Sequence, residues 1–201
     1  MRWVLIVALA SVPAAADPVK PDPERPAFTD DTWRVHSAGD VTVDGGFVTG
    51  FPAALPTGLT TGVGGGVTVG QTFAWGARAS WSSATESSIA WTVDHADLRL
   101  RATGAVQKAA GRGTFALRVG LGTTIVHETR TRNQGMRAGL TGSDLETSAV
   151  DALPAGDLEG VIALHVAGPW LVVVSGGPSL AIVDGSAHAS WTAELGIGWQ
   201  P

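Results

Sequence analysis

Hydrophobic and polar residues alternate along much of this chain, most regularly over its last fifteen residues, 187–201. The apolar positions there share one parity, namely Ala189, Trp191, Ala193, Leu195, Ile197 and Trp199. The intervening positions hold polar or very small residues, namely His188, Ser190, Thr192, Glu194, Gly196, Gly198 and Gln200. A period of two sustained over this length predicts a β-strand with two unlike faces.

The same alternation predicts seven further strands upstream, which makes eight in all. Their expected ranges are within 33–48, then 58–69, 72–82, 88–103, 114–128, 158–166 and 170–182. In the fourth range the apolar parity changes near Asp94 and His95, which predicts a β-bulge at that point.

The segments between these strands alternate between compact turns and more variable connections. Compact turns are expected at 70–71, 107–113 and 168–169; the other connections include 83–87, the irregular segment 129–156 and Asp184-Gly185. Within 129–156, a capping box from Ser143 to Glu146 predicts a helix of two turns. An even number of antiparallel strands with short turns on one side predicts an all-β, eight-stranded, antiparallel up-and-down transmembrane β-barrel.

Alternation alone does not decide which face of such a barrel points outward. A soluble lipocalin-like barrel directs Trp and Leu inward and Arg outward, whereas a transmembrane barrel reverses this arrangement. The polar face consists mainly of Gly, Ala, Ser and Thr, which suits the narrow interior of eight strands. Lys20 and Lys108 are the only lysines, too few for a solvated outer surface. The sequence therefore favours the transmembrane arrangement.

Tryptophans near the strand ends predict the two aromatic girdles of a membrane barrel. Trp191 and Trp199 lie eight residues apart on one face. A tilted strand separates them by about 20 Å along the barrel axis, close to the apolar band of about 25 Å. Tyrosine is absent, so tryptophan alone has to supply the girdles. The expected girdle residues are Trp75, Trp81, Trp91, Trp170, Trp191 and Trp199.

The first residues carry one basic side chain, a short apolar run and the small residues Ala14 to Ala16. This pattern predicts a cleaved signal peptide at 1–16, with a buried N-terminal helix as the alternative. Residues 17–31 are rich in proline and charge, which predicts an extended periplasmic leader that acts as a linker or a docking segment. The barrel domain is then expected at 32–201.

Composition excludes several classes of function. The net charge of −5 disfavours nucleic-acid binding, and the absence of cysteine excludes disulfides. The spacing of His36, His95, His127 and His165 is not that of metal ligands. We therefore expect no metal and no cofactor.

With these features the chain resembles the small eight-stranded outer-membrane β-barrel proteins of Gram-negative bacteria over nearly its whole mature length. The resemblance implies a monomer in the outer membrane, in contact with membrane lipid and lipopolysaccharide and assembled by the barrel-assembly machinery. Members commonly end in an aromatic residue that this machinery reads. Here Trp199 is followed by Gln200 and Pro201, so the signal is displaced.

Isolated charges on the polar face form a candidate lumen cluster. They would either line a charged pore or pair as salt bridges that plug the interior, because an unpaired buried charge is costly. Glu194 has no cation on the strand before it, so we expect an arginine partner across the lumen. The cluster consists of Arg78, Asp97, Arg99, Arg101, Arg118 and Glu194.

Two further sets of residues are candidate sites. Arg130, Arg132 and Arg137 open the irregular segment and would either contact lipopolysaccharide phosphates or lie in a solvated loop. His188, Ser190 and Glu194 loosely resemble the His-Ser-Glu site of outer-membrane lipid A deacylases, as base, nucleophile and orienting acid. Along a strand, however, Glu194 lies about 13 Å from Ser190.

Together these features predict an outer-membrane barrel with a structural, adhesive or narrow-pore role and no catalysis. A lipid A-modifying barrel enzyme and a soluble periplasmic lipocalin-like carrier are the alternatives.

Overall fold

The computed structural model describes residues 41–51, 59–136, 139, 142 and 145–201. The signal peptide and the leader lie outside these residues, as does the start of the expected two-turn helix. From Glu146 onward that segment is a strand, so the predicted helix is wrong. A short 3-10 helix, η1 (Gln134–Met136), follows β5. Among the described residues no helix is long and apolar enough to cross a membrane. The strands in chain order are β1 (Val41–Phe51), β2 (Thr60–Gly70), β3 (Phe73–Ser87), β4 (Trp91–Ala110), β5 (Gly113–Arg132), β6 (Glu146–Ala167), β7 (Trp170–Val183) and β8 (Ser186–Trp199).

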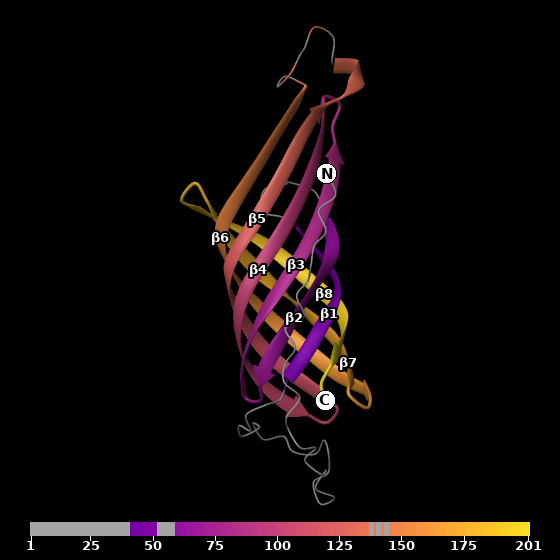
Figure 1. Ribbon diagram of the computed structural model, residues 1–201, viewed down its shortest axis with the longest axis vertical. Helices are drawn as coiled ribbons and strands as arrows, with labels where there is room; N and C mark the ends of the chain where they lie inside the picture. The colour runs from indigo at the N-terminus through magenta and orange to yellow at the C-terminus, as the bar shows by residue number, and fades with distance from the viewer. Residues whose placement is uncertain (1–40, 52–58, 137–138, 140–141, 143–144) are drawn as a thin grey trace, which may run out of the picture.

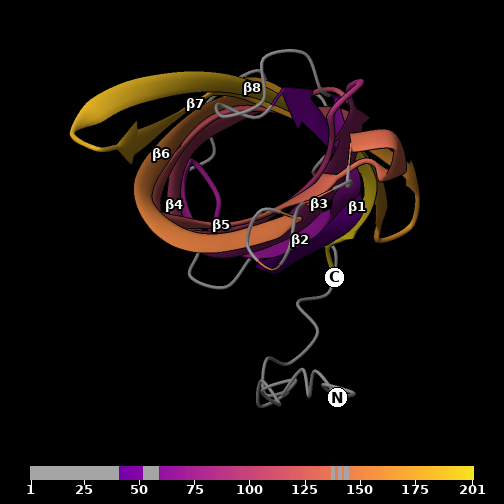
Figure 2. The same cartoon turned by 90° about the horizontal axis from the view of Figure 1, so that it is seen from above.

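Each strand pairs antiparallel with the next, and β1 pairs with β8 to close the ring (Figures 1 and 2). The closing ladder runs from Val43 opposite Trp199 to Phe51 opposite Trp191. Closure gives both edges of the sheet a hydrogen-bonded neighbour over this stretch. The predicted eight-stranded up-and-down barrel is confirmed.

Polarity across the barrel wall is inverted relative to a water-soluble barrel. Trp75 is 70% exposed and Leu121 is 67% exposed on the outside. Asp97 and Arg118, by contrast, are only 3% and 5% exposed on the inside. A soluble lipocalin-like carrier has the opposite arrangement, since its apolar side chains form the interior. The described residues therefore match the transmembrane arrangement that the sequence favours.

The two ends of the barrel differ. The turn end carries the tight turns at Gly70, Gly111 and Gly168, where positive φ angles favour glycine. The loop end is taller on one side, because β4 and β5 have 20 residues and β6 has 22, whereas β1 and β2 have 11 each. Figure 1 shows this taller wall rising above the rest of the barrel.

At the loop end, β6 and the β7–β8 hairpin separate. Their pairing begins at Ala155 opposite Ala181, so the part of β6 above Ala155 pairs with β5 alone. The hairpin turns at Asp184 and Gly185 and projects to the side of the barrel (Figures 1 and 2). A cleft lies at this end, with residues of the hairpin and of upper β6 in its lining.

Several strands are longer than the alternating pattern predicts. Residues 83–87 belong to β3 and not to a loop, and most of the expected irregular segment 129–156 belongs to β5 and β6. On the outer face these extensions carry polar residues in β3 and β5, and in β6 only Val150 and Ala152 interrupt polar residues, proline and glycine, so no regular apolar repeat marks a strand. Their backbone ladders nevertheless continue, since Thr131 pairs with Glu146 and Glu86 pairs with Val93.

The predicted bulge near Asp94 and His95 is wrong. β4 pairs with β3 and with β5 without a register shift. The apolar parity changes there because the outer face becomes polar and the inner face becomes partly apolar above this level. A register shift occurs instead between β6 and β7, at His165 and Ala167.

Candidate functional site

The interior at mid-height is built around Arg78 of β3. Its Nη1 lies 2.5 Å from Oδ1 of Asp44 in β1, and its Nη2 donates to Oε2 of Glu194 in β8 at 2.6 Å. Gly66 of β2 stands in register between Asp44 and Arg78. A Cβ at Gly66 would lie 2.6 Å from Cγ of Arg78, so glycine is what lets the arginine cross β2.

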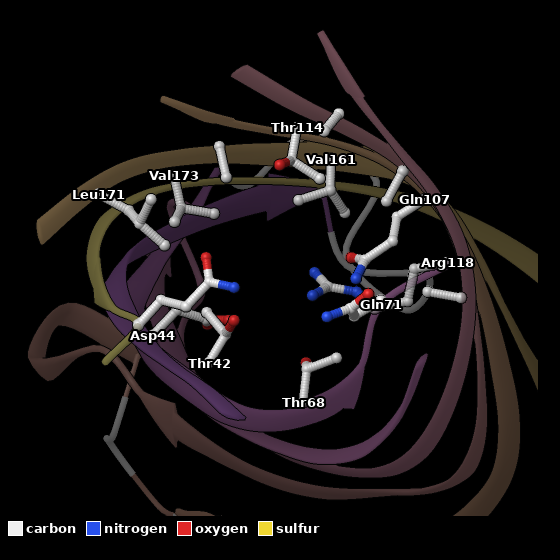
Figure 3. Close-up of a pocket in the computed structure, with 15 residues that line it drawn as sticks. Thr42, Asp44, Thr68, Gln71, Gln107, Thr114, Arg118, Val161, Leu171 and Val173 are labelled. Carbon is white, nitrogen blue, oxygen red and sulfur yellow. The ribbon is translucent and has the colours of Figure 1, made fainter. Parts of the chain in front are cut away.

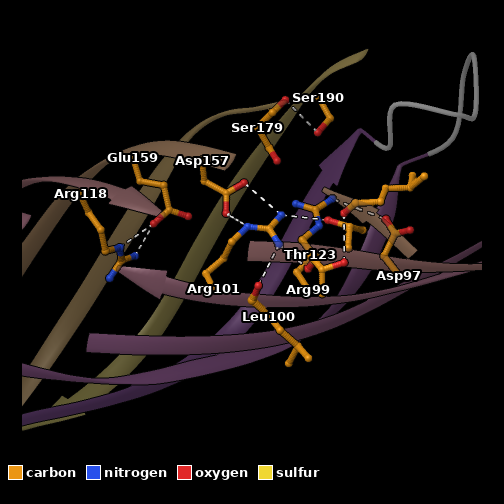
Figure 4. Close-up of polar contacts among 12 residues, drawn as sticks. Asp97, Arg99, Leu100, Arg101, Arg118, Thr123, Asp157, Glu159, Ser179 and Ser190 are labelled. Carbon is orange, nitrogen blue, oxygen red and sulfur yellow. Dashed lines mark hydrogen bonds and ion pairs between the residues drawn. The ribbon is translucent and has the colours of Figure 1, made fainter. Parts of the chain in front are cut away.

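A second arginine, Arg101 of β4, crosses β5 to reach β6. Its Nε donates to Oδ2 of Asp157 at 2.6 Å, and its Nη2 donates to Oγ1 of Thr124 at 2.9 Å (Figure 4). Nη1 donates to the carbonyl oxygens of Leu100 and Thr123. This guanidinium therefore has partners on every nitrogen, which is what a buried cation requires.

The third arginine, Arg118 of β5, forms an ion pair toward the turn end. Its Nε donates to Oε2 of Glu159 in β6 at 2.7 Å (Figure 4). Nη2 also donates to Oγ of Ser175 in β7 at 3.3 Å, so one guanidinium connects three consecutive strands.

The fourth group lies along β4 itself, nearer the loop end. Oδ2 of Asp97 lies 3.5 Å from Nη2 of Arg99, and Oδ1 lies 2.8 Å from Nε2 of His95. Residues two apart on a strand share a face, so all three side chains point inward. His95 is 2% exposed and forms the upper limit of the charged interior.

Together these groups fill the lumen. Four arginines face five carboxylates there, and the spaces left between them are small. One cavity of about 70 Å³ lies toward the turn end, lined by Asp44, Gln107 and Arg118 among others (Figure 3). Another, of about 40 Å³, lies beside Arg78 and Asp157. Ion pairs between strands therefore cross-link the interior.

All six residues of the expected lumen cluster point inward. The structure also identifies their ion-pair partners, which the sequence leaves open. The arginine partner that the sequence predicts for Glu194 is Arg78. Asp44, Asp157 and Glu159 complete the other pairs. Asp44 and Glu159 lie at polar positions of the alternating pattern, so parity could have identified them. Asp157 immediately precedes the predicted strand 158–166, so the alternating pattern does not place it on a face.

Five of the six expected girdle tryptophans lie on the outer surface. Their exposed fractions range from 40% for Trp199 to 70% for Trp75. Trp91 is the exception, and its assignment to the girdle is wrong. It shares the inward parity of Asp97, and the guanidinium of Arg132 lies 4.3 Å from the centroid of its ring. The expected bulge would have turned Trp91 outward, and β4 has none.

Two of the three arginines expected in a loop, Arg130 and Arg132, lie on β5. Arg130 is exposed, with Nε 2.5 Å from Oε1 of Glu128. Arg132 stacks on Trp91. Arg137 lies outside the described residues. The first two guanidinium groups therefore already have protein partners.

The deacylase-like residues do not form a catalytic arrangement. Oγ of Ser190 donates to the carbonyl oxygen of Ser179 at 3.4 Å (Figure 4). Glu194 is held by Arg78, and His188 is exposed in the β7–β8 hairpin. Glu194 therefore is not available to orient the imidazole of His188.

No protein-family model matches the chain, and no curated protein matches it. Among solved structures, the attachment invasion locus protein Ail of Yersinia pestis is similar with a TM-score of 0.51 and 12% identity, over 82% of this chain and 100% of that one. The outer membrane protein OprG of Pseudomonas aeruginosa is similar with a TM-score of 0.53 and 12% identity, over 83% of this chain and 97% of that one. At this identity the likeness shows the fold, which is that of small eight-stranded outer-membrane barrels.

Proposed function

We propose that this chain is an outer-membrane barrel with a non-conducting interior, which serves a structural or adhesive role at the cell surface and catalyses no reaction. The observation that carries the proposal is the set of ion pairs across the lumen. Arg78 links β3 to β1 and β8, and Arg101 links β4 to β6. A steady ion path would have to break these buried pairs, which is costly.

The outer surface supports insertion into a bilayer. Leu121, Ile197 and Trp191 are each more than 60% exposed and belong to a belt of apolar side chains that encircles the barrel. Contiguous apolar surface of this extent is unfavourable in water and favourable against lipid. Export through a signal peptide at 1–16, a leader at 17–31 and assembly by the barrel-assembly machinery as a monomer belong to the same proposal.

The loop end is the end that we place outside the cell. Longer strands and connections at one end are typical of the outer side of such barrels. The upper parts of β4, β5 and β6 then project beyond the lipid and offer a surface for contacts. Arg130, Arg132 and Arg137 stay the candidates for contact with lipopolysaccharide phosphates, although Arg130 pairs with Glu128 and Arg132 stacks on Trp91.

Conductance in planar lipid bilayers tests the closed interior. The native protein should give no steady current steps, whereas a variant with Arg78→Ala and Arg101→Ala should conduct, because both cross-lumen links are removed. Heat-modifiable migration on a gel shows that both proteins are folded. Steady channels from the folded native protein would replace this proposal with the narrow-pore role. Recovery of the native protein outside the outer-membrane fraction would refute its location.

A further inference from the structure

A cleft of about 780 Å³ opens at the loop end, above the charged interior. The inner faces of upper β4, β5 and β6 form its wall, and Val183 and Asp184 of the β7–β8 hairpin lie opposite. Sites for small molecules in proteins commonly have volumes of roughly 300–1,000 Å³. The cleft is therefore large enough for a small organic molecule, unlike the cavities of about 70 and 40 Å³ in the lumen.

The wall of the cleft is mainly apolar. Trp91 and Val93 of β4, Val126 of β5 and Leu153 of β6 all line it. These side chains are neither fully buried nor on the outer surface. Lipid on the outside of the barrel does not explain apolar residues on its inner face. A ligand with an apolar body would remove them from water, which is favourable.

The charge of the cleft is negative. Three carboxylates line it, those of Glu128, Asp151 and Asp184. Two guanidinium groups are beside them: that of Arg130, which already pairs with Glu128, and that of Arg132, which stacks on Trp91. No ion pair joins Asp151 or Asp184 to another of the described residues. Two carboxylates beside an apolar wall attract a cation and repel an anion.

We propose that this cleft binds a small amphipathic cation, with an aromatic or aliphatic body against Trp91, Val126 and Leu153 and an ammonium group toward Asp151 and Asp184. The apolar wall supplies the affinity, and the carboxylates select the sign of the ligand's charge. This binding site is additional to the structural or adhesive role and does not depend on whether the lumen conducts.

Three indole compounds of similar size separate these contributions. Tryptamine carries an ammonium group, indole is neutral, and indole-3-propionate carries a carboxylate. Calorimetric titration of the full chain in lipid nanodiscs, corrected with empty nanodiscs, should show saturable binding that is strongest for tryptamine and weakest for indole-3-propionate. Asp151→Asn should weaken the affinity for tryptamine by about threefold, because an exposed charge contributes modestly. The affinity for indole, which carries no charge, should stay unchanged.

A pair of tryptophan substitutions on β6 locates the site. Ala149 lines the cleft, whereas Val150 is 65% exposed on the outer face. Ala149→Trp should fill the cleft and abolish tryptamine binding, and Val150→Trp should leave it intact. Heat-modifiable migration shows that each variant is folded.

Two results would overturn the proposal. One is the absence of saturable tryptamine binding to the native protein at millimolar concentration. The other is binding that is equal for the three compounds or unchanged by Ala149→Trp, since such binding would be partition into the lipid or adventitious contact elsewhere.

Discussion

Arg78 and Glu194 are separated by 116 positions in the sequence, yet Nη2 of the arginine donates to Oε2 of the glutamate at 2.6 Å inside the barrel. The same guanidinium also reaches Asp44, so one cation holds two carboxylates. Strands β1, β8 and β3 are thereby linked across the point where the barrel closes. The pairing joins Asp44 and Glu194, which lie toward opposite ends of the sequence, to Arg78 in its first half. The sequence around any one of these residues therefore does not reveal its partners.

Removing the charge of Glu194 and removing that of Arg78 should destabilise the barrel to different extents. Glu194→Gln leaves Arg78 paired with Asp44, so it should lower the free energy of unfolding by about 1.5–3 kcal/mol, the range for a hydrogen bond to a charged group. Arg78→Met leaves two buried carboxylates without a cation and should cost about 3–5 kcal/mol. Urea unfolding in lipid vesicles measures both. The double variant should cost less than the sum; strict additivity would show that the two side chains do not interact.

Ala77 should lie near the middle of the lipid-facing belt, between Trp75 and Trp81 on the outer face of β3. Ala77→Arg would then place a charge near the bilayer midplane and cost about 2–4 kcal/mol. Ser87→Arg is the matched control, because Ser87 lies on the same face beyond Trp81 and is solvated at the loop end. Folding into vesicles should fail or slow for the first variant alone. Equal folding of the two would contradict the assignment of the outer face.

Gly62 lies where β2 and β3 approach closely. A Cβ there would lie 2.5 Å from Cα of Ser82 and nearer still to the carbonyl oxygen of Trp81, so the two strands would have to separate. We expect Gly62→Ala to lower the free energy of unfolding by roughly 1–3 kcal/mol. Gly135→Ala, where a Cβ meets no atom within 4 Å, should have little effect. Equal urea midpoints for the two variants would disprove the steric explanation.

Trp81 and Trp91 should differ in contact with lipid. Brominated lipid quenches tryptophans that touch the acyl chains, and Trp81 is exposed on the outer face while Trp91 lines the cleft. Trp81→Phe should therefore lower the fraction of emission that is quenched, and Trp91→Phe should raise it. Trp191→Phe is a second outward control and should behave as Trp81→Phe does. The reverse result would restore Trp91 to the girdle.

Ser190 should have no catalytic role. Its Oγ donates to a backbone carbonyl, and Glu194 is held by Arg78. In a host that expresses the protein, Ser190→Ala should leave the acylation of lipid A unchanged, as determined by mass spectrometry. A deacylated product that depends on Ser190 would establish the enzyme alternative instead.

The strands were predictable where the chain has one apolar and one polar face. Residues 170–182 were expected as a strand, and β7 spans Trp170–Val183. The prediction failed where no apolar repeat marks either face, as between Thr129 and Arg132 or between Glu146 and Asp151. The backbone ladder continues there regardless of side-chain polarity. Side-chain alternation therefore marks only the part of a strand that has two unlike environments.

The sequence by itself determined that this chain forms eight antiparallel strands with apolar side chains outside and isolated charges inside. The strands follow from a period of two, which is local and is read along one strand at a time. The direction of the apolar face follows from the small residues of the polar face and the scarcity of lysine. Only the tertiary structure decided that Arg78 pairs with Asp44 and Glu194 and that Arg101 pairs with Asp157. It also decided that Trp91 lines a cleft. These depend on the stagger between strands, on glycines that let an arginine cross a neighbour, and on an uninterrupted register in β4. Each is a relation between strands, and such relations are fixed only when the barrel closes.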